Sequence, residues 1–375
     1  MWDPDRKTEN VWLSIADLPQ CLHAVATDSK EYVSDLAAKK MRLIPKGSLL
    51  VSFKLTLGRL AYAGRDLFSN EAIASLLDID ERQISKEFLY WALTAFDWHK
   101  AAEGDQKIKG KTLNKAKLKT IPIPLPAPEE QQRIVTVLDE AFEGLARARA
   151  HAEANAQNAR ELIEAGLGTA FSPEVAEQNG WEICELGAIA DLSYGYTTKA
   201  QAEATGPRFL RITDIQYGAV DWSSVPFCKT PPDDYERYRV KRGDIVFART
   251  GATTGKSYLL TEDLEAVAAS YLIRLRLTSS KLKPEYLAFF FQSDIYWENI
   301  RAGISGSTQG GFNASKLKEL RISVPPLDVQ DAVISRLSEI QRRAESLANA
   351  YGDKLQYLDD LRQSLLQKAF AGELR

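Results

Sequence analysis

The sequence predicts two consecutive copies of one mixed α/β (α+β) fold. Each globular block is followed by a long helix, and the two helices pair as an antiparallel coiled coil. Two observations lead to this prediction. The chain of 375 residues matches itself when it is shifted by 199 positions. Each copy also ends in a long segment whose apolar residues recur at alternating spacings of four and three, which is the pattern of a coiled-coil seam.

The repeat is strongest where one block passes into its long segment. The stretch from Leu113 to Phe171 aligns without a gap on the stretch from Phe312 to Phe370, with 14 identities among the 59 pairs. Asn114 falls on Asn313 and Gln131 falls on Gln330 in this alignment. Upstream the match continues with small gaps, so the globular parts are also expected to share one fold.

Composition describes an ordinary globular chain. Hydrophobic residues make up 45%, charged residues 26%, and the formal net charge is −3. No apolar run approaches the length that crosses a bilayer, and the first residues lack the apolar core of a signal peptide. Cys21, Cys184 and Cys228 are isolated, which predicts neither a disulfide framework nor a zinc site. We therefore expect a reduced, cytoplasmic protein without bound metal.

Each long segment is predicted to be a helix of about forty residues, or ~60 Å at 1.5 Å per residue. Each begins after a proline-rich linker, and acidic residues and glutamine fill its first turns, as suits a helix N-terminus. Both seams are interrupted at one place, by Asn155 and Lys354. Pairing of the two seams with each other is the simplest reading, although packing on the chain's own blocks or on another protein stays open. The predicted seam residues are Ile134, Leu138, Ala141, Leu145, Ala148, Ala152, Ala159 and Leu162, then Val333, Leu337, Ile340, Ala344, Leu347, Leu358, Leu361 and Leu365.

The blocks before these segments read as short strands followed by one helix. We expect strands within 12–18, 47–53 and 58–64 of the first block, and within 208–215, 243–250, 256–262 and 268–277 of the second. The helices are expected over 85–102 and 283–303, with aromatic residues at helical spacing in the core. The predicted division is a first block at 1–120, a helical spacer at 121–172, a second block at 173–321 and a second spacer at 322–375.

One stretch, Phe247–Leu260, could be mistaken for a phosphate-binding loop. In that motif four residues separate a glycine from Gly-Lys-Ser, whereas only three residues separate Gly251 from Gly255. The residues after Ser257 read as a strand rather than as the helix that would face the phosphates. A β-hairpin with a glycine-rich tip is the preferred interpretation, and nucleotide binding through Lys256 is the less favoured alternative.

Taken together, these motifs resemble the specificity subunit of type I restriction–modification systems. The resemblance rests on the hinge LNKAKLKTIPIPLPAPEEQQRIV and its echo FNASKLKELRISVPPLDVQ, on VKRGDIVFARTG, and on the terminal LRQSLLQKAFAGELR. It implies that the two blocks are target recognition domains, each reading one half of a split DNA site. It also implies that the helices separate the blocks and dock the modification subunits, of which two are expected.

Several further expectations follow from this resemblance. The chain itself would be non-catalytic, and S-adenosylmethionine, ATP and magnesium would belong to the partner modification and restriction subunits. DNA contacts are expected on the hairpin tips and on the glycine-rich loops after the block helices, where short polar and basic side chains can reach phosphates and base edges. The candidates are Lys54, Thr56, Arg59, Lys107, Lys109 and Lys111 in the first block, and Arg249, Thr250, Thr253, Thr254, Lys256, Ser305, Ser307, Thr308 and Gln309 in the second.

The two blocks differ at their beginnings. The second opens with about thirty residues before Arg208, and the first has no counterpart to this stretch. The family resemblance implies such an opening segment in both blocks. A truncated or inactive specificity copy is therefore an open alternative, and so is a scaffold whose blocks bind protein.

Overall fold

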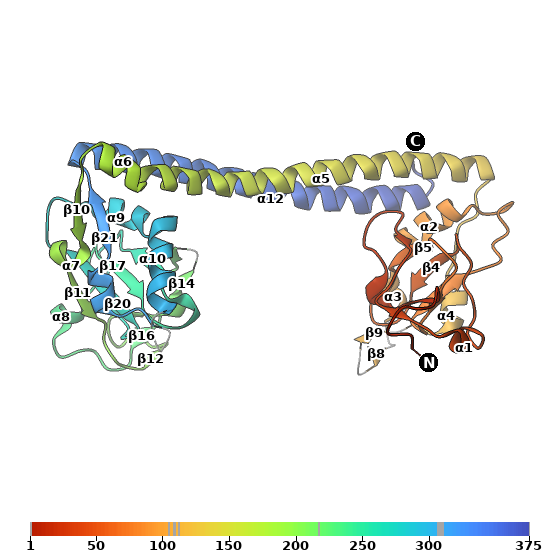
Figure 1. The fold of residues 1–375 in the computed structure, drawn as a ribbon, viewed down its shortest axis with the longest axis horizontal. Helices are drawn as coiled ribbons and strands as arrows, with labels where there is room; N and C mark the ends of the chain where they lie inside the picture. Colours follow the sequence, from red (N-terminus) through yellow and green to blue (C-terminus); the bar gives the residue numbers. More distant parts are fainter. Residues whose placement is uncertain are drawn as a thin grey trace. The chain divides into compact units, whose positions relative to one another are not determined.

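The computed structural model describes residues 2–103, 106–107, 110–111, 113–216, 218–305 and 311–374, with backbone alone at 106–107, 110–111 and 305. The chain divides into two compact units, which are treated separately below. Unit 1 contains Met1–Ala152 and Asp353–Arg375, and unit 2 contains Glu153–Gly352. Each unit therefore includes a globular block and a portion of each long helix (Figure 1).

Unit 1 is built around a four-stranded sheet whose strand order is β2-β5-β4-β7. A second sheet of unit 1 has three strands in the order β3-β1-β6. The strands are β1 (Val11–Leu13), β2 (Val25–Ala26), β3 (Glu31–Tyr32), β4 (Leu49–Ser52), β5 (Leu60–Ala63), β6 (Phe68–Ser69), β7 (Ile73–Leu76), β8 (Gln106–Lys107) and β9 (Gly110–Lys111). The helices are the 3₁₀ turn η1 (Ile15–Asp17), α1 (Asp35–Ala38), α2 (Lys86–Ala95), α3 (Trp98–Ala101) and α4 (Lys115–Lys119).

Unit 2 repeats this plan and adds strands to it. Its main sheet has the order β11-β20-β17-β18, and a second sheet has the order β12-β16-β13-β19. The strands are β10 (Glu182–Glu185), β11 (Ala190–Tyr194), β12 (Ala200–Gln201), β13 (Arg208–Leu210), β14 (Ile215–Gln216), β15 (Ala219–Val220), β16 (Phe227–Cys228), β17 (Ile245–Ala248), β18 (Ser257–Leu259), β19 (Ala266–Ala268), β20 (Leu272–Leu277) and β21 (Arg321–Val324). The helices are α6 (Pro173–Gln178), α7 (Leu186–Ile189), η2 (Ile212–Asp214), α8 (Tyr235–Tyr238), η3 (Gly251–Thr253), α9 (Pro284–Phe290), α10 (Asp294–Ser305) and α11 (Ala314–Lys318).

The central strand of each main sheet divides two cores. Side chains alternate across a strand, so Leu49 and Val51 of β4 face the core that contains α2 and the long helices, whereas Leu50 faces the core beneath the other sheet. In unit 2, Ile245 and Phe247 of β17 face the core that contains α9 and the long helices, and Val246 faces the core beneath the second sheet. An uninterrupted apolar run thus marks a strand that is buried on both faces.

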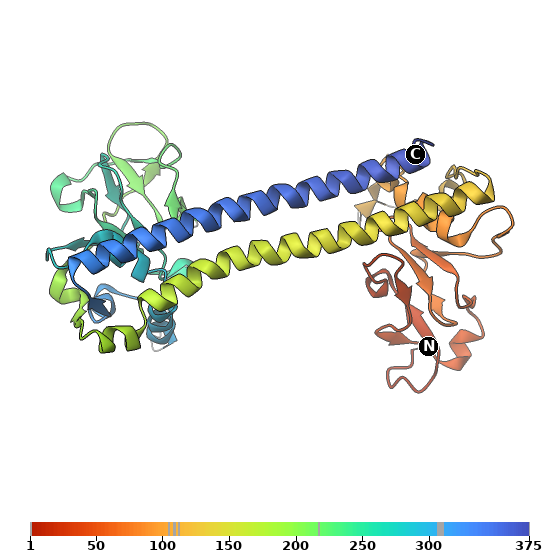
Figure 2. The ribbon, with the colours of Figure 1, turned by 90° about the horizontal axis from the view of Figure 1, so that it is seen from above.

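The long helices are α5 (Pro128–Ala170) and α12 (Leu327–Phe370). They run antiparallel within each unit, and Figure 2 shows them side by side. In unit 1, Arg149 of α5 pairs with Asp359 of α12 at 2.7 Å. In unit 2, Gly166 of α5 lies against the side chains of Leu337 and Ile340 of α12. The predicted antiparallel pairing is therefore confirmed in both units.

The predicted coiled-coil seam is wrong at two positions. Leu162 and Leu347 are exposed, by 46% and 43%. The inward positions are instead Ala156 and Ile163 on α5, and Ala348 and Leu355 on α12. On each helix, the spacing between inward-facing residues is therefore four twice in succession, instead of four and then three. This compensates for the drift of a 3.6-residue helix against a strict heptad. The polar Asn155 lies next to this change of phase on α5, whereas Lys354 of α12 lies after it, next to the inward Leu355.

The two block helices are also shorter than predicted. The segment 85–102 divides into α2 and α3 because Asp97 caps a new helix, with its side chain accepting from the Lys100 N–H at 2.9 Å. The segment 283–303 divides into α9 and α10 at Ser293, whose hydroxyl accepts from the Tyr296 N–H. The prediction of an aromatic core is confirmed, since Phe88, Trp91 and Tyr286 are fully buried.

Buried glutamines join each block to its long helix. The Gln131 side chain accepts from the Ser85 N–H at 3.0 Å and donates to the carbonyls of Gln83 and Pro126. Gln330 accepts from the Lys283 N–H at 2.8 Å and donates to the carbonyls of Lys281 and Pro325. Each glutamine thus ties the start of the block helix and the proline-rich linker to the first turn of α5 or α12.

The units differ where the sequence predicts a difference. In unit 2, β10 pairs with β21 and β11 pairs with β20, and α7 connects the two strands. The described part of unit 1 has no counterpart of β10, α7 and β11, so β7 is an edge strand. Within the residues that the structure describes, no helix has the length and apolar character needed to cross a membrane.

Candidate nucleic-acid interface

The glycine-rich stretch of unit 2 is the tip of an antiparallel hairpin. Strands β17 and β18 pair from Ile245–Leu259 to Phe247–Ser257, and the 3₁₀ turn η3 connects them. A strand rather than a helix follows Gly255, so the arrangement that aims a helix N-terminus at phosphates is absent from this described segment. The preferred reading of the sequence as a hairpin is confirmed, and the phosphate-loop alternative is wrong.

The conformation of this tip depends on two glycines and on Thr254. Gly251 and Gly255 have φ angles of +74° and +96°, in the region that side chains with a Cβ disfavour. At Gly255 a Cβ would also lie 2.7 Å from the Trp297 ring. The Thr254 side chain is buried, and its hydroxyl donates to the Gly251 carbonyl at 2.8 Å. Thr254 therefore shapes the turn and does not present its hydroxyl to solvent.

Arg249 lies at the base of the tip between two exposed tyrosines. Its guanidinium carbon is 5.0 Å from the ring centre of Tyr194 and 5.9 Å from that of Tyr271. Its Nε donates to the Ser270 carbonyl at 3.1 Å, which leaves the terminal nitrogens available for other acceptors. Tyr194 and Tyr271 are 45% and 58% exposed. An arginine held by aromatic faces is pre-organised for planar acceptors such as phosphate or the guanine edge.

Four segments distant in sequence meet at this cluster. Tyr194 ends β11, Tyr271 precedes β20, and Arg249 follows β17. The Phe312 N–H donates to the Arg249 carbonyl at 3.0 Å, and the Ala314 N–H donates to the Tyr194 hydroxyl at 3.3 Å. The half-buried Thr250 belongs to the same tip, and the Thr253 hydroxyl donates to the Thr250 carbonyl at 3.3 Å. The tip, the sheet edge and the start of α11 thus form one surface.

Lys256 borders a different part of unit 2. It lines a cleft of about 600 Å³ together with residues of α9, α10 and α12, among them Glu285, Trp297 and Ile334. Its backbone carbonyl accepts from the Ala248 N–H at 2.8 Å and so belongs to the hairpin ladder. The structure therefore does not group Lys256 with Arg249, Thr250 and the tyrosines.

A buried arginine supports the sheet behind this surface. Arg274 of β20 is 7% exposed and donates to the carbonyls of Arg237 and Arg239 at 2.9 and 3.0 Å. Burial, and to a smaller extent the neighbouring Arg276 charge, lowers the pKa of Arg274. Arg276 makes two bonds of 2.7 and 2.6 Å to the buried carboxylate of Asp244, which raise the pKa of Arg276. These contacts fix the register of the strands that carry Arg249.

Unit 1 has an equivalent but smaller tip. The Gly58 N–H donates to the Ser52 carbonyl at 2.8 Å, as the Gly255 N–H does to the Ala248 carbonyl at 2.9 Å. A Cβ at Gly58 would meet the Trp98 ring, as one at Gly255 would meet Trp297. The Leu113 N–H donates to the Phe53 carbonyl at 2.9 Å, which reproduces the bond from Phe312 to Arg249. The connection is one residue shorter than in unit 2.

The predicted contact residues of unit 1 are distributed unevenly. Lys54 lies over the Phe53 ring, and Thr56 is exposed at the tip beside Leu55, which has a φ of +63°. Arg59 instead donates to the Ile15 carbonyl at 3.0 Å and holds the turn after β1. Lys54 and Thr56 are therefore presented to solvent together, whereas the Arg59 side chain is engaged within the unit.

The remaining predicted residues are described in part or not at all. Lys107 and Lys111 lie on β8 and β9, which pair as a short hairpin, and Ser305 ends α10. Only the backbone of these three residues is described. Lys109, Ser307, Thr308 and Gln309 lie outside the described residues.

Tyr194 and Tyr271 were missed by the sequence reasoning, although they flank the predicted Arg249. Both occur in short stretches, SYGY and AASY, in which small residues surround a large aromatic residue. Such a pattern suggests an exposed ring at a strand end. The sequence could not indicate that two of these rings meet one arginine.

Comparisons with known proteins agree with the repeated architecture. The family model described as the type I restriction modification DNA specificity domain matches residues 4–150 and 178–351. The specificity subunit of the EcoKI type I restriction enzyme of Escherichia coli K12 is 26% identical over 263 residues, which cover 65% of this chain and 56% of that protein. The chain therefore spans little more than half the length of this relative. The MjaIX specificity subunit of Methanocaldococcus jannaschii is 23% identical, with 97% of this chain and 86% of that protein covered.

Two solved structures share the fold. The HsdS subunit from Thermoanaerobacter tengcongensis superposes with a TM-score of 0.64 and 19% identity, covering all of this chain and 94% of the other. A chain from a study of complex assembly and conformational transition in a type I R-M system superposes with a TM-score of 0.71 and 20% identity, covering 89% of this chain and 84% of the other. At these identities the likeness concerns the fold.

Proposed function

The chain belongs to the type I restriction-modification DNA specificity family, and from that premise we propose that it is the DNA specificity subunit of such a complex. Each unit would read one half of a bipartite DNA target through its hairpin tip and the loop that follows its block helices. The chain would also dock the methyltransferase and restriction subunits, which carry the catalysis and bind S-adenosylmethionine, ATP and magnesium.

The observation that supports DNA reading most directly is the Arg249 cluster. An arginine with free terminal nitrogens can donate two bonds to guanine O6 and N7, and this is the commonest specific contact in the major groove. Tyr194 and Tyr271 pack against the guanidinium, and phosphate contacts from the same surface would set the register of the protein on the duplex. Thr250 adds a small donor and acceptor beside the arginine. In unit 1, Phe53 occupies the position of Arg249, and Lys54 and Thr56 of the same tip would contact the DNA instead.

The pairing of α5 with α12 supports the second part of the proposal. Two readers that are joined through a helical element can recognise two short motifs at a fixed spacing, since half-site separation follows protein geometry. The repeated hinges at Pro126 and Pro325 give the chain two similar surfaces next to the two blocks. One modification subunit at each hinge is therefore the stoichiometry that we propose.

A binding selection tests the proposal. The chain is co-purified with its cognate modification subunit, the complex is incubated with a randomised duplex pool, and the bound fraction is sequenced. Two short motifs separated by a constant gap are the expected result, with an affinity that falls steeply as salt rises because counterions are released. The absence of any enriched motif, or binding that salt does not weaken, would contradict the proposal.

A specificity copy with one silent half is the second candidate. It is favoured by the uncovered edge strand β7 of unit 1. In the same selection this candidate predicts a single enriched motif. Replacement of Arg249 by alanine would then weaken binding to that motif, whereas replacement of Lys54 by alanine would leave it unchanged.

A further inference from the structure

Tyr296 of α10 is fully buried, and its hydroxyl donates to the Gly255 carbonyl at 2.5 Å. Gly255 belongs to the hairpin tip of unit 2 (249–256), which begins with Arg249. We propose that Tyr296 is a positioning residue for DNA recognition, because its bond to Gly255 makes α10 hold the tip in the conformation that presents Arg249. The effect on DNA rests on the proposed function, whereas the link between α10 and the tip can be measured without DNA.

The Tyr296 hydroxyl has a fixed place and a fixed protonation state. Its ring packs against aromatic neighbours, with its centre 4.8 Å from that of Phe291 and 5.4 Å from that of Trp297. Burial raises the pKa of Tyr296 well above its ordinary value, so the hydroxyl remains a neutral donor at physiological pH. The acceptor residue, Gly255, is buried as well. A buried carbonyl that loses its donor costs stability, so the two groups stay together.

The side of α10 that carries Tyr296 fits closely against Gly255. A Cβ on Gly255 would lie 2.7 Å from Trp297 and 3.0 Å from Ile300. Tyr296 and Ile300 are four residues apart, so they lie on one side of the helix and both reach the glycine. Gly255 also has a φ of +96°, which a residue with a Cβ disfavours. The close approach of α10 thus depends on glycine at this position, and a shift of the helix would move the tip.

A short chain of hydrogen bonds connects Gly255 to Arg249. The Gly255 N–H donates to the Ala248 carbonyl at 2.9 Å, and the Ala248 N–H donates to the Lys256 carbonyl at 2.8 Å. Arg249 is the next residue after Ala248, so its backbone position follows from this pair of bonds. A displacement of Gly255 is therefore passed to the backbone of Arg249.

The other end of α10 is attached to the same arginine. The Lys316 Nζ donates at 2.6 Å to the carbonyl of Gly303 in the last turn of α10, which joins α10 to α11. Just before α11, the Phe312 N–H donates to the Arg249 carbonyl at 3.0 Å. Helix α10 thus reaches the Arg249 backbone by two routes, through Tyr296 and through α11. Two attachments restrict the arginine more than one would, and a pre-organised donor loses less entropy when it binds a base edge.

The tip of unit 1 is held from within its own hairpin. Ser52, the counterpart of Ala248, is fully buried, and its hydroxyl accepts from the Arg59 N–H at 2.9 Å. This bond joins the two strands of the hairpin, β4 and β5, at the turn. In unit 2 the same position is alanine, and a side-chain bond to the tip comes from Tyr296 of α10 instead.

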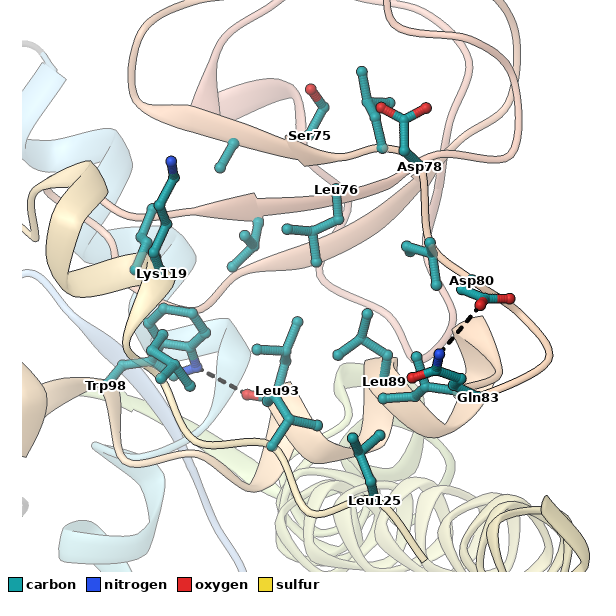
Figure 3. Close-up of a pocket in the computed structure, with 18 of the residues that line it drawn as sticks. Ser75, Leu76, Asp78, Asp80, Gln83, Leu89, Leu93, Trp98, Lys119 and Leu125 are labelled. Carbon is teal, nitrogen blue, oxygen red and sulfur yellow. Dashed lines mark hydrogen bonds between the residues drawn. The ribbon is translucent and has the colours of Figure 1, made fainter. Parts of the chain in front are cut away.

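The indole ring that lies against the tip of unit 1 uses its N–H elsewhere. A Cβ on Gly58 would meet the Trp98 ring. The Trp98 indole N–H donates to the Leu93 carbonyl at 2.9 Å, as Figure 3 shows. Trp98 therefore packs against the tip of unit 1 and does not donate to it. A change at Tyr296 should accordingly alter the tip of unit 2 alone.

Amide hydrogen exchange on the full chain tests the link without DNA. Tyr296→Phe removes the hydroxyl and keeps the ring, so the Gly255 carbonyl is left buried without its donor. Exchange of the amides at 251–257 should then become about tenfold faster, whereas the amides of β20 and of the unit 1 tip should keep their rates. Tyr286→Phe is the matched control, because Tyr286 is equally buried in unit 2 and its ring packs against Phe171 of α5.

A DNA selection with the complex of this chain and its cognate modification subunit tests the consequence. Tyr296→Phe should reduce discrimination at one base pair by about fivefold or more. That base pair should be the one at which Arg249→Ala loses its preference, and the double variant should lose no more than Arg249→Ala alone. The motif read by unit 1 and the dependence of affinity on salt should match those of the unaltered complex. A merely structural role of Tyr296 would lower affinity for every sequence alike.

Two results would overturn the proposal. One is unchanged exchange at 251–257 in Tyr296→Phe, since the tip would then not depend on the hydroxyl. The other is faster exchange with an unchanged base preference, because a loosened tip would still present Arg249. If the unaltered complex selects no motif, the proposed function fails, and the exchange at 251–257 alone decides whether α10 holds the tip. Intact exchange rates in β20 show that the variant is folded.

Discussion

Gln131 and Gln330 make the same three hydrogen bonds at the same place in the two units. Each is buried, with exposures of 2% and 0%. Each accepts one bond from the start of a block helix and donates two to carbonyls, one of them a proline carbonyl of the hinge. The repeat is therefore preserved in its polar interior as well as in its apolar pattern.

Replacement of either glutamine by alanine should destabilise the unit that contains it. The change leaves one buried N–H and two carbonyls without partners, and an unsatisfied buried group costs about 1–3 kcal/mol. We expect Gln131→Ala to lower the free energy of unfolding by at least ~2 kcal/mol in urea denaturation. Gln132→Ala is the control, since Gln132 is exposed on the next position of α5, and it should change stability by less than ~0.5 kcal/mol.

Gly251 and Gly255 should respond differently to alanine. Both have positive φ, which costs about 1–2 kcal/mol for a residue with a Cβ. At Gly251 the added Cβ has open space, whereas at Gly255 it collides with Trp297 and Ile300. Gly255→Ala should therefore lower the unfolding temperature of unit 2 clearly more than Gly251→Ala. Equal effects in calorimetry would show that the contact with Trp297 relaxes without cost.

Arg249→Ala should relax the DNA specificity of unit 2. If the guanidinium reads a guanine edge, its loss costs about 1–3 kcal/mol of discrimination at one base pair. A binding selection with the variant complex would then show one degenerate position in one motif. Arg242→Ala is the control, because Arg242 is exposed before β17, at the end of the strand opposite to Arg249. A uniform loss of affinity without degeneracy would assign Arg249 to phosphate contact instead.

The three cysteines should differ in reactivity. Cys228 is fully buried, and burial raises the pKa of its thiol to about 11. Cys21 is exposed and Cys184 is half-buried. Because the thiolate is the nucleophile, iodoacetamide at pH 8 should modify Cys21 first and Cys228 last. Mass spectrometry of peptides from a time course, with a urea-unfolded sample as the reference, measures the order.

Because the pKa of Cys228 is raised, the free energy of unfolding of unit 2 should fall as the pH becomes alkaline. An unfolded cysteine ionises near pH ~8.5, so the neutral thiol is favoured in the folded state between that value and about 11. The contribution of Cys228 to the free energy of unfolding is complete below the lower value and is lost as pH rises through the higher one. Cys228→Ala should flatten this decline in denaturation measured from pH 8 to 11.

The long-range arrangement of the fold could be predicted from sequence because it depends on patterns of many residues. Heptads and proline-rich linkers located both long helices, and the internal alignment related Gln131 to Gln330. The seam was wrong at Leu162 and Leu347 because a single change of phase moves the inward face by one residue. The helix breaks at Asp97 and Ser293 depend on one cap each, and an apolar pattern does not reveal them.

The candidate site was harder to predict. Arg249 and Thr250 follow from the position of a hairpin tip, but Tyr194 and Tyr271 join them through strand pairing that only the folded sheet defines. Thr254 and Arg59 have the composition expected of a DNA contact, yet their side chains make bonds within the protein. Sequence gives the residue types of a loop, whereas the direction of each side chain depends on local φ angles such as that of Gly255.

Pro122 and Pro124 of the unit 1 hinge stand where unit 2 has Arg321 and Ser323 of β21. They have a consequence for how the protein behaves at high concentration. An exposed sheet edge usually acts as a template on which strands of other copies add one after another, and this is the route to fibres and precipitates. A strand that pairs with the hinge of unit 1 finds prolines on the far side, where a further strand would need donors. Addition of strands at the hinge therefore stops after a single strand, and the hinge of unit 1 cannot seed a growing aggregate.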